Sequence, residues 1–370
     1  MLNLLLILVF IRPFISSLAF PNIDFIYSFI LAGVLLAWIL LKGSFLKELK
    51  PVQYPLLFFI LALLISIIFS INKTNSLGQL YKYIANILVF IVGVSLSYEN
   101  KHKIIRVLVL AGFVISILAI YQYLFGFSHI TSYVSKKGIT NPFVLDCLAN
   151  KRIFLPFITP NSLAGYLILI VPLILIINDK EKWFVLGVVL LAILLTKSIG
   201  GLMALSAGVL FYALISKKFN LKRMLIFISL AAAVIFIFNL RQSLTKEHLH
   251  PLFSVARRFD YCTWGLKIIK AHFLTGVGIG NFNSPFSRFA HNSYIQIWAE
   301  MGILGIISFL WLIFTIFKSG LQNLKSYPQN KTLGLVLTTA FIFLVHNLID
   351  FTFFLPEIGM IWWLLVGLEY

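Results

Sequence analysis

The stretch HNSYIQIWAEMGILGIISFLWLIFTIF, residues 291–317, decides the class of this protein. It opens with His291 and continues into an apolar run that is long enough to cross a bilayer as a helix. A titratable group at the mouth of a membrane helix is costly to keep and well placed to move a proton. The stretch therefore predicts both a transmembrane helix and a candidate catalytic base.

The rest of the chain has the same apolar character. It is 60% hydrophobic and 11% charged over 370 residues, with a mean hydropathy of +0.99, which excludes a soluble globular protein. Alternating barrel strands would give a different pattern, so the spans are predicted to be helical. We expect an all-α, polytopic integral membrane protein with a single membrane domain, residues 1–370, of about twelve transmembrane helices. The expected spans are 2–20, 23–41, 52–71, 80–97, 104–124, 161–178, 183–196, 199–215, 223–240, 291–317, 333–349 and 352–369.

The first apolar segment is interrupted by Arg12 and Pro13 and has no basic region before it. This favours a first transmembrane span over a signal peptide cleaved after Ala19. Arg12 is then expected to face protein or water, because a charge facing lipid is costly.

The net charge of +18 is distributed as in a membrane protein, which argues against a nucleic-acid partner. Lysines gather on the short connections that would be cytoplasmic if the N-terminus is inside, as the positive-inside rule requires. The sequence therefore predicts a multi-pass membrane protein with both termini in the cytoplasm. Two long loops, 125–160 and 241–290, are predicted on the outer side.

Most of the arginines fall on those two outer loops, where insertion does not require them. A guanidinium group binds phosphate oxygens in a bidentate manner, whereas lysine suffices for topology. The pattern favours a phosphate-bearing ligand at the outer face, and the alternative is solvated loops that touch anionic lipid. The outer arginines are Arg152, Arg241, Arg257, Arg258 and Arg288.

Other features of the outer loops are less specific. Cys147 and Cys262 could form a disulfide on an oxidising side, but two unpaired thiols are favoured. Residues 252–273 have an amphipathic pattern that is typical of a helix on the membrane surface. Residues 276–281, Gly-Val-Gly-Ile-Gly-Asn, lack the sixth-position glycine and the βαβ unit of a dinucleotide-binding fingerprint. A turn whose backbone amides hold an anion is a weakly supported alternative.

The helix that follows His291 contains further candidate functional residues. His291, Trp298, Gly302 and Gly305 share one helical stripe, and the glycines would let a neighbouring helix approach closely. The positive end of the helix dipole disfavours a protonated ring, and a neutral ring can act as a general base. Glu300 is expected to make a structural ion pair or hydrogen bond at membrane depth.

Metal catalysis is not predicted, since the outer carboxylates are scattered and His248 and His250 lack a third ligand. We expect no cofactor. Without a cation, a departing phosphate would have to be stabilised by the arginines.

These residues resemble the bacterial O-antigen ligase and polymerase superfamily of polytopic membrane glycosyltransferases. The shared pattern is His-Asn, nine residues, Gly-x-x-Gly, which is matched at His291, Asn292, Gly302 and Gly305. Further matching pieces, in the same order as in the family, are Arg152 to Asn161, Arg258 through Trp264 to Gly278, and His346 to Asp350.

The chain also departs from the family pattern. Where many members have Ser-Arg, this chain reads Thr196–Lys197–Ser198, so Lys197 takes the place of that cation. The threonines that often follow the second glycine are Ile306 and Ile307 here.

The resemblance implies a GT-C-like fold, a place in the bacterial inner (cytoplasmic) membrane, and a metal-independent transfer on the outer face of that membrane. The donor would be an undecaprenyl-diphosphate-linked glycan, and the acceptor would be lipid A-core or a growing polysaccharide. His291 would be the base, and the diphosphate would be held by Arg152, Arg258 and Lys197, with Arg257 or Arg288. Asn292, Gly302, Gly305, Asn161, Trp264, His346 and Asp350 would support the site. The alternative is a transporter or flippase for lipid-linked saccharides, which would need internal repeats and ionisable residues along a mid-membrane path.

Overall fold

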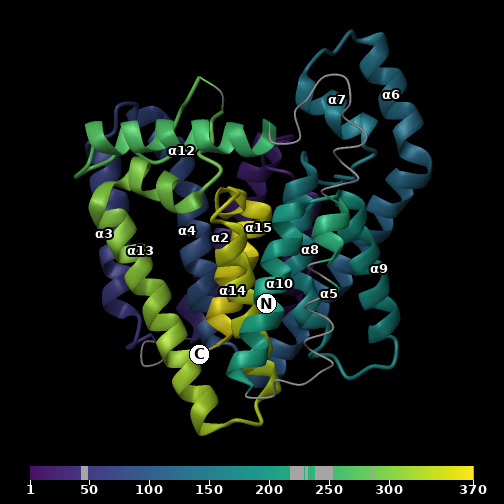
Figure 1. The fold of residues 1–370 in the computed structure, drawn as a ribbon. Helices are drawn as coiled ribbons and strands as arrows, with labels where there is room; N and C mark the ends of the chain where they lie inside the picture. The colour runs from purple at the N-terminus through teal and green to yellow at the C-terminus, as the bar shows by residue number, and fades with distance from the viewer. Residues whose placement is uncertain (43–48, 217–228, 230–231, 238–252, 286, 370) are drawn as a thin grey trace.

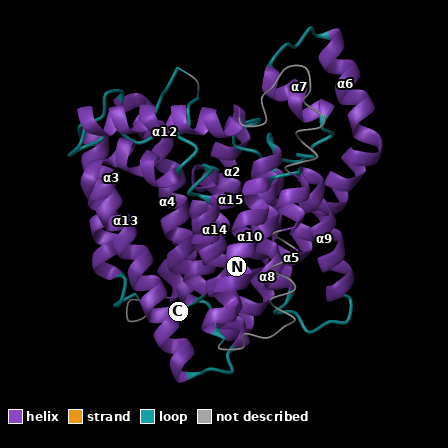
Figure 2. Ribbon diagram, in the orientation of Figure 1, coloured by secondary structure: helices purple, strands orange, loops and turns teal. Residues whose placement is uncertain are grey.

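The computed structural model describes the chain except for residues 43–48, 217–228, 230–231, 238–252, 286 and 370. The described residues form helices and loops without strands, as predicted (Figure 2). The helices are α1 (Leu2–Ile11), η1 (Arg12–Phe14), α2 (Pro21–Lys42), α3 (Gln53–Ile68), α4 (Lys73–Ser95), α5 (Tyr98–Tyr121), η3 (Gln122–Gly126), α6 (Phe127–Lys136), α7 (Pro142–Ala149), α8 (Pro160–Ile174), α9 (Lys182–Thr196), α10 (Ile199–Ile215), α12 (Phe253–Ala271), α13 (Ser293–Ser326), α14 (Lys331–His346), η4 (Thr352–Phe354) and α15 (Pro356–Leu368).

Several of these helices are long and apolar enough to cross a membrane. Four meet both criteria of length and composition, namely Pro21–Lys42, Lys73–Ser95, Tyr98–Lys136 and Ser293–Ser326. The shorter apolar helices of 10–17 residues are α1 with η1, α3, α8, α9, α10, α14 and α15. The expected span at 223–240 lies mostly outside the described residues, so the expected number of spans stays a prediction.

Helix α15 lies at the centre of the bundle. Every one of its residues is buried, as expected for a helix that is apolar on all sides. It packs against α4 through Gly93 and Gly367, where an added Cβ at Gly93 would lie 3.0 Å from the carbonyl oxygen of Leu364. The absence of side chains at this pair allows the two backbones to approach closely.

The buried charge of Arg12 is neutralised inside the protein. Its guanidinium lies 2.6 Å from Oδ1 of Asp24 and 3.6 Å from Oε2 of Glu357, and none of the residue is exposed. The expectation that Arg12 faces protein is therefore confirmed. The ion cluster joins η1, α2 and α15 at one end of the bundle.

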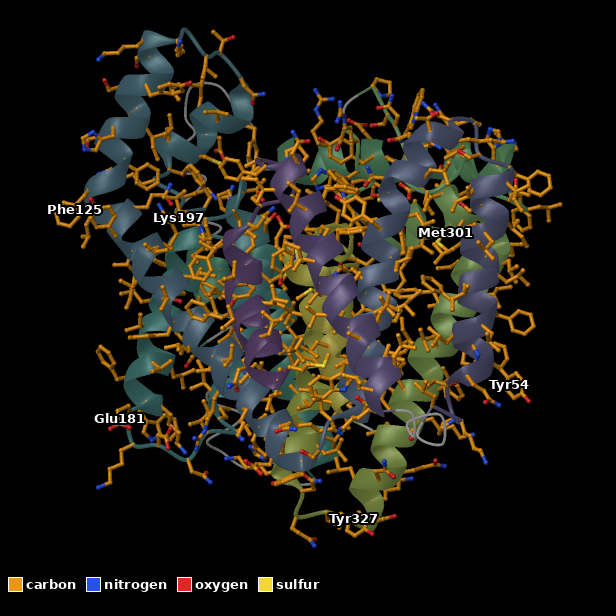
Figure 3. The ribbon with its side chains drawn as sticks, turned by 180° about the vertical axis from the view of Figure 1, so that it is seen from behind. Tyr54, Phe125, Glu181, Lys197, Met301 and Tyr327 are labelled. Atoms are coloured by element: carbon orange, nitrogen blue, oxygen red, sulfur yellow. The ribbon has the colours of Figure 1, made fainter. Side chains whose placement is uncertain are left out.

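The two ends of the bundle differ. Helix α12 lies across one end, and α6 and α7 project beyond that same end (Figure 1). Lys197 lies toward this end, whereas Tyr54, Glu181 and Tyr327 lie toward the other (Figure 3).

The helical run that contains the expected span 104–124 is longer than predicted and covers Tyr98–Lys136. A π-helical turn at Gln122–Gly126 carries α5 directly into α6, so the helical run extends to Lys136. The predicted loop 125–160 consequently begins as helix and contains α7 as well. In the second predicted loop, the helix expected over 252–273 is observed at Phe253–Ala271. Cys147 and Cys262, one in each region, are not joined by a disulfide.

Candidate functional site

His291 directly precedes Asn292, the N-cap of α13, and has an unusual backbone conformation. Its φ of 50° is left-handed, a conformation that is uncommon outside glycine although histidine tolerates it better than most residues. The side chain of Asn292 then caps α13 by accepting hydrogen bonds from the amides of Tyr294 and Ile295, both at 3.0 Å. The His-Asn pair is therefore a turn and a helix cap, and the cap holds the histidine at the helix entrance.

The entrance of α13 is fastened to the loop after α14. Nδ2 of Asn292 donates to the carbonyl of Leu348 at 2.9 Å. The hydroxyl of Ser293 donates to Oδ1 of Asn347 at 2.7 Å, and its amide donates to the carbonyl of Asn347 at 2.9 Å. These bonds bring the 346–350 segment beside the entrance of α13, next to His291.

The imidazole of His291 lies between two aromatic rings. It stacks on Tyr261 of α12, with ring centroids 4.7 Å apart, and meets Phe351 edge to face at 4.8 Å. Burial and the positive charge of Arg258 lower the pKa of His291 to about 4, although the carboxylate of Asp350 acts in the opposite direction. The ring is therefore neutral near pH 7 and can accept a proton.

Two charged groups accompany the histidine. Arg258 of α12 and Asp350 lie close enough to act electrostatically on both His291 and His346. Asp350 is 2% exposed, and its Oδ1 accepts the amide of Phe351 at 2.8 Å. Nδ1 of His346 lies 3.3 Å from the hydroxyl of Thr352, so this second histidine is positioned by the same loop.

Arg152 and Lys197 form a second cluster. Arg152 is 3% exposed; it donates to the carbonyl of Thr196 and to Oδ1 of Asn161, both at 3.0 Å, and lies 3.6 Å from Asp146. Nζ of Lys197 donates to the carbonyl of Asn150 at 2.7 Å. The two cations thus tie the segment before α8 to the junction of α9 and α10.

Glycines connect this cluster to the histidine site. Gly165, one helical turn after Asn161, packs against the ring of His346, where an added Cβ would lie 2.9 Å from Cε1. An added Cβ at Gly200 would lie 2.7 Å from Cδ1 of Ile349. The elements that hold Arg152 and Lys197 and the entrance of α13 therefore both contact the 346–350 segment.

The remaining predicted residues lie around α12. Arg257 pairs with Asp260 at 3.5 Å on the same helix. Trp264 donates to the carbonyl of Asn283 at 3.0 Å, which fastens α12 to the loop that leads to His291. Arg288 lies on that loop and is exposed. The histidines considered as metal ligands, His248 and His250, lie outside the described residues.

The predicted role of the glycines in α13 needs correction. Gly302 has φ 66° and ψ −169°, so α13 is broken there and the expected continuous stripe does not exist. A Cβ at Gly302 would overlap the carbonyl of Leu274, so the close approach is to a loop and not to a helix. At Gly305 the nearest atoms belong to Met301 of the same helix.

The break in α13 exposes carbonyl groups that the Gly276–Asn281 loop uses. The amides of Val277 and Gly278 donate to the carbonyls of Ala299 and Glu300, both at 2.9 Å. The carboxylate of Glu300 accepts the amide of Gly280 at 2.8 Å and Nε2 of Gln296 at 2.9 Å. The predicted hydrogen-bonding role of Glu300 is confirmed, and its carboxyl group is the group that the glycine-rich turn binds.

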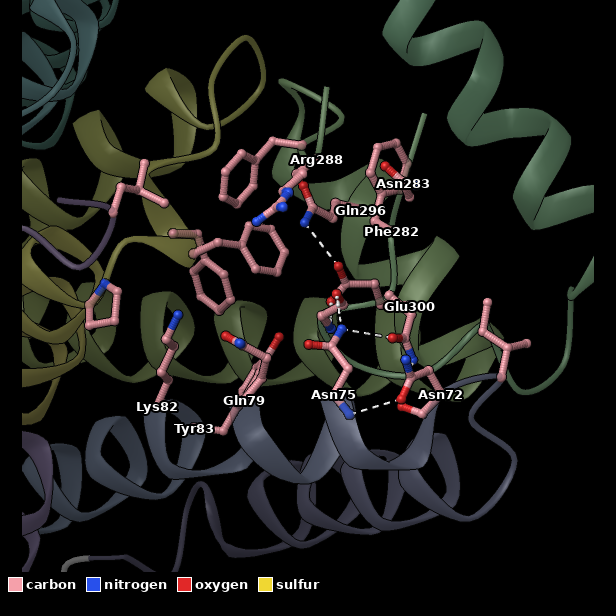
Figure 4. Close-up of a pocket in the computed structure, with 18 of the residues that line it drawn as sticks. Asn72, Asn75, Gln79, Lys82, Tyr83, Phe282, Asn283, Arg288, Gln296 and Glu300 are labelled. Carbon is pink, nitrogen blue, oxygen red and sulfur yellow. Dashed lines mark hydrogen bonds between the residues drawn. The ribbon is translucent and has the colours of Figure 1, made fainter. Parts of the chain in front are cut away.

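A cavity of about 530 Å³ lies beside this turn. Helix α4 forms one wall, and the 280–289 loop with the start of α13 forms the opposite wall (Figure 4). The lining residues are Leu18, Ile71, Asn72, Asn75, Gln79, Lys82, Tyr83, Asn86, Gly280, Asn281, Phe282, Asn283, Arg288, Phe289, Gln296, Glu300, Phe353, Phe354 and Pro356.

Sequence reasoning missed the α4 wall, although a signal was present. Polar residues recur at spacings of three and four within an otherwise apolar helix, which places them on one face. They are Asn72, Asn75, Gln79, Lys82 and Asn86.

One comparison with known proteins identifies a relationship. Residues 184–310 match a family model described as O-Antigen ligase. The matched segment includes Arg258, His291 and Gly302, whereas Arg152 and the 346–350 segment lie outside it. No curated protein matches the chain.

Proposed function

Because the chain belongs to the O-antigen ligase and polymerase superfamily, we propose that it transfers a glycan from undecaprenyl diphosphate to an acceptor hydroxyl. The acceptor is lipid A-core or a growing polysaccharide. Family and apolar helices indicate an integral membrane enzyme of the glycosyltransferase type. One observation supports this glycan transfer above all. Arg258 and Asp350 lie within electrostatic reach of a neutral His291 at the entrance of α13.

His291 is the proposed general base. A ring nitrogen takes the proton of the acceptor hydroxyl, while the hydroxyl oxygen attacks the anomeric carbon of the donor. The bond between that carbon and the diphosphate oxygen breaks, and the diphosphate leaves with the electron pair. The proton on the imidazolium then passes to solvent, which restores the neutral ring.

Arg258 and Asp350 are proposed to act on opposite charges. Arg258 binds the diphosphate, because a guanidinium makes charge-assisted bonds to phosphate oxygens. Asp350 stabilises the imidazolium that forms when His291 accepts the proton. A diphosphate beside Arg258 also offsets the charge that lowers the pKa of His291, so donor binding makes the base stronger.

The other cations have different roles in this proposal. Arg152 already contacts Thr196, Asn161 and Asp146, so we assign it to holding the site wall in place. Direct phosphate contact by Arg152 or Lys197 stays a prediction. Arg257 is paired with Asp260. We therefore assign the second contact to the diphosphate to Arg288, which is exposed on the loop before His291.

We propose that the end carrying α12 faces the outside of the cytoplasmic membrane and that both termini are cytoplasmic. Lysines at the opposite connections support this orientation. Nζ of Lys42 donates to the carbonyl of Ser95 at 2.7 Å, and Nζ of Lys331 donates to the carbonyl of Leu175 at 2.9 Å. These lysines bind the C-terminal ends of α4 and α8, where a positive charge is favourable.

The test compares His291→Ala with His272→Ala, a matched control because His272 is exposed near the same end of the bundle. Purified protein in nanodiscs is mixed with undecaprenyl-diphosphate-linked disaccharides and with lipid A-core or a second lipid-linked unit, and products are identified by mass spectrometry. Loss of a general base should slow transfer by about 10²- to 10⁴-fold, whereas His272→Ala should retain activity. Wild-type transfer by His291→Ala would remove the proposed base.

A further inference from the structure

The cavity between α4 and the 280–289 loop contains polar atoms that the fold itself does not use. The hydroxyl of Tyr83 and Oδ1 of Asn86 are buried and have no hydrogen-bond partner among the described residues. Tyr83 is 7% exposed and Asn86 is 6% exposed. A buried polar atom without a partner costs free energy, so its retention next to a cavity indicates that a ligand supplies the partner.

The other walls of the cavity are rigid. Nδ2 of Asn75 donates to the carbonyl of Gly280 at 2.7 Å and to Oδ1 of Asn281 at 2.8 Å. The amide of Gly280 donates to Oε2 of Glu300 at 2.8 Å, and Nε2 of Gln296 donates to Oε1 of Glu300 within α13 (Figure 4). These bonds join α4, the loop and α13, so the cavity is formed before any ligand enters, as is typical of ligand sites.

The chemistry of the lining fits a saccharide. Amide side chains and the Tyr83 hydroxyl can both donate and accept hydrogen bonds, which matches the dual character of sugar hydroxyl groups. Phenylalanine rings supply apolar faces for the carbon-bound hydrogens of a sugar ring. They are Phe282, Phe289, Phe353 and Phe354. The volume of about 530 Å³ lies within the range of roughly 300–1,000 Å³ that is usual for small-molecule sites.

The cavity adjoins the proposed base. The ring of Phe289, which lines the cavity, stacks on Phe351 with centroids 4.1 Å apart. Phe351 in turn contacts the ring of His291 at 4.8 Å. Phe289 and Phe351 therefore connect the lining of the cavity to the histidine by direct ring contacts.

We infer that the cavity lined by Tyr83, Asn86 and the 280–289 loop binds a saccharide unit of one of the substrates. This inference deepens the proposed function and rests on it for the source of the saccharide, but binding itself does not depend on transfer. The saccharide belongs either to the lipid-linked donor or to the acceptor, because both carry the same hydroxyl chemistry.

The test measures binding directly with Tyr83→Phe and a matched control, Tyr166→Phe. Tyr166 is likewise buried and its hydroxyl has no hydrogen-bond partner among the described residues, but it lies on α8 and does not line the cavity. Saturation-transfer NMR of the full chain in nanodiscs uses glucose, galactose, mannose, rhamnose, N-acetylglucosamine and glucuronate with their di- and trisaccharides. Tyr83→Phe should bind the retained saccharide about 2- to 10-fold more weakly, as expected for one lost hydrogen bond, and Tyr166→Phe should bind as the wild type does.

Thermal stability separates binding from folding. Removal of an unpartnered buried hydroxyl should leave the folded state as stable or more stable, so Tyr83→Phe should bind the saccharide more weakly without a loss of thermal stability. The inference is overturned if no saccharide of the panel binds, or if Tyr83→Phe and Tyr166→Phe weaken binding equally.

A competition experiment identifies the source of the saccharide. An undecaprenyl-diphosphate-linked disaccharide is added to the protein with the bound free saccharide. Loss of the free-saccharide signal assigns the cavity to the donor, and retention assigns it to the acceptor. His291→Ala should bind the saccharide normally in either case. If this variant also retains transfer, the proposed base fails while the cavity assignment stands.

Discussion

Replacement of Gly302 by alanine tests the break in α13, on which the geometry of the site depends. With φ 66° and ψ −169°, this residue occupies a region that is essentially restricted to glycine. An added Cβ would overlap the carbonyl of Leu274 and would lie 2.7 Å from the amide nitrogen of Thr275. Both contacts are to backbone, so no side-chain rotation can relieve them.

The expected cost follows from these contacts. The backbone conformation alone costs of order 1–3 kcal/mol for a residue with a Cβ. Displacement of the loop also breaks the bond from the amide of Ile303 to the carbonyl of Phe273, at 3.0 Å, which is worth about 1 kcal/mol. Together with the overlap, we expect a loss of about 3–5 kcal/mol, a large share of a typical free energy of unfolding.

Reversible unfolding by SDS in mixed micelles, followed by tryptophan fluorescence, measures this loss. Gly33→Ala is the matched control, because no atom lies within 4 Å of its added Cβ and alanine is the better helix former. Gly302→Ala should unfold at a much lower SDS fraction, and Gly33→Ala should unfold at or above the wild-type value. The reasoning is refuted if Gly302→Ala unfolds with the wild type.

Two further predictions concern the reaction. Transfer needs the neutral ring of His291 and is lost as pH falls through its pKa, so kcat/KM should decline at about pH 4, below the ordinary histidine range. A pH–rate profile checks this, and a decline centred at or above 6.5 would contradict it. Arg258→Ala should lower kcat/KM by about 10- to 100-fold, the value of a charge-assisted bond to phosphate. Arg257→Ala, which removes a residue paired with Asp260, should lower it less than threefold. Equal losses in the two variants would count against Arg258 as the diphosphate ligand.

The helical class of the fold could be predicted because it depends on local composition. Apolar runs must satisfy their backbone polar groups internally, and a helix does so without distant partners. The extension of α5 into α6 was missed, since the polar composition of residues 127–136 resembles that of a loop. Its first turn is π-helical, and such turns have no strong local signature.

The motif residues were predicted from the order of the family's motifs along the chain. The structure shows contacts between two of these motifs. Asn292 and Ser293 bind the loop that contains Asn347, so the two motifs meet although they are distant in sequence. The role of Gly302 was misjudged because the residues on both sides favour a helix. Only the position of Leu274, brought there by tertiary packing, reveals why glycine is needed.

Of the two walls of the cavity, only the α4 wall has a signal in the sequence. The polar face of α4 is visible in the sequence, since Asn75, Gln79 and Lys82 recur at helical spacing. The opposite wall comes from Phe282 and Arg288, far along the chain, and no local pattern pairs the two segments.

The first segment of α13, residues 293–301, is fixed at both of its ends. At its start, Ser293 is bonded to Asn347, and at its end the carbonyl of Glu300 accepts bonds from Gly278 and from the hydroxyl of Ser66 at 2.8 Å. His291 precedes this segment, and Gln296 and Glu300 face the cavity from within it. The base and the saccharide cavity are therefore attached to one short helix whose position is set by α3, the glycine-rich turn and the 346–350 segment. Because a helix of this length moves as a unit, displacement of the turn at Gly302 should disturb the cavity and the base together.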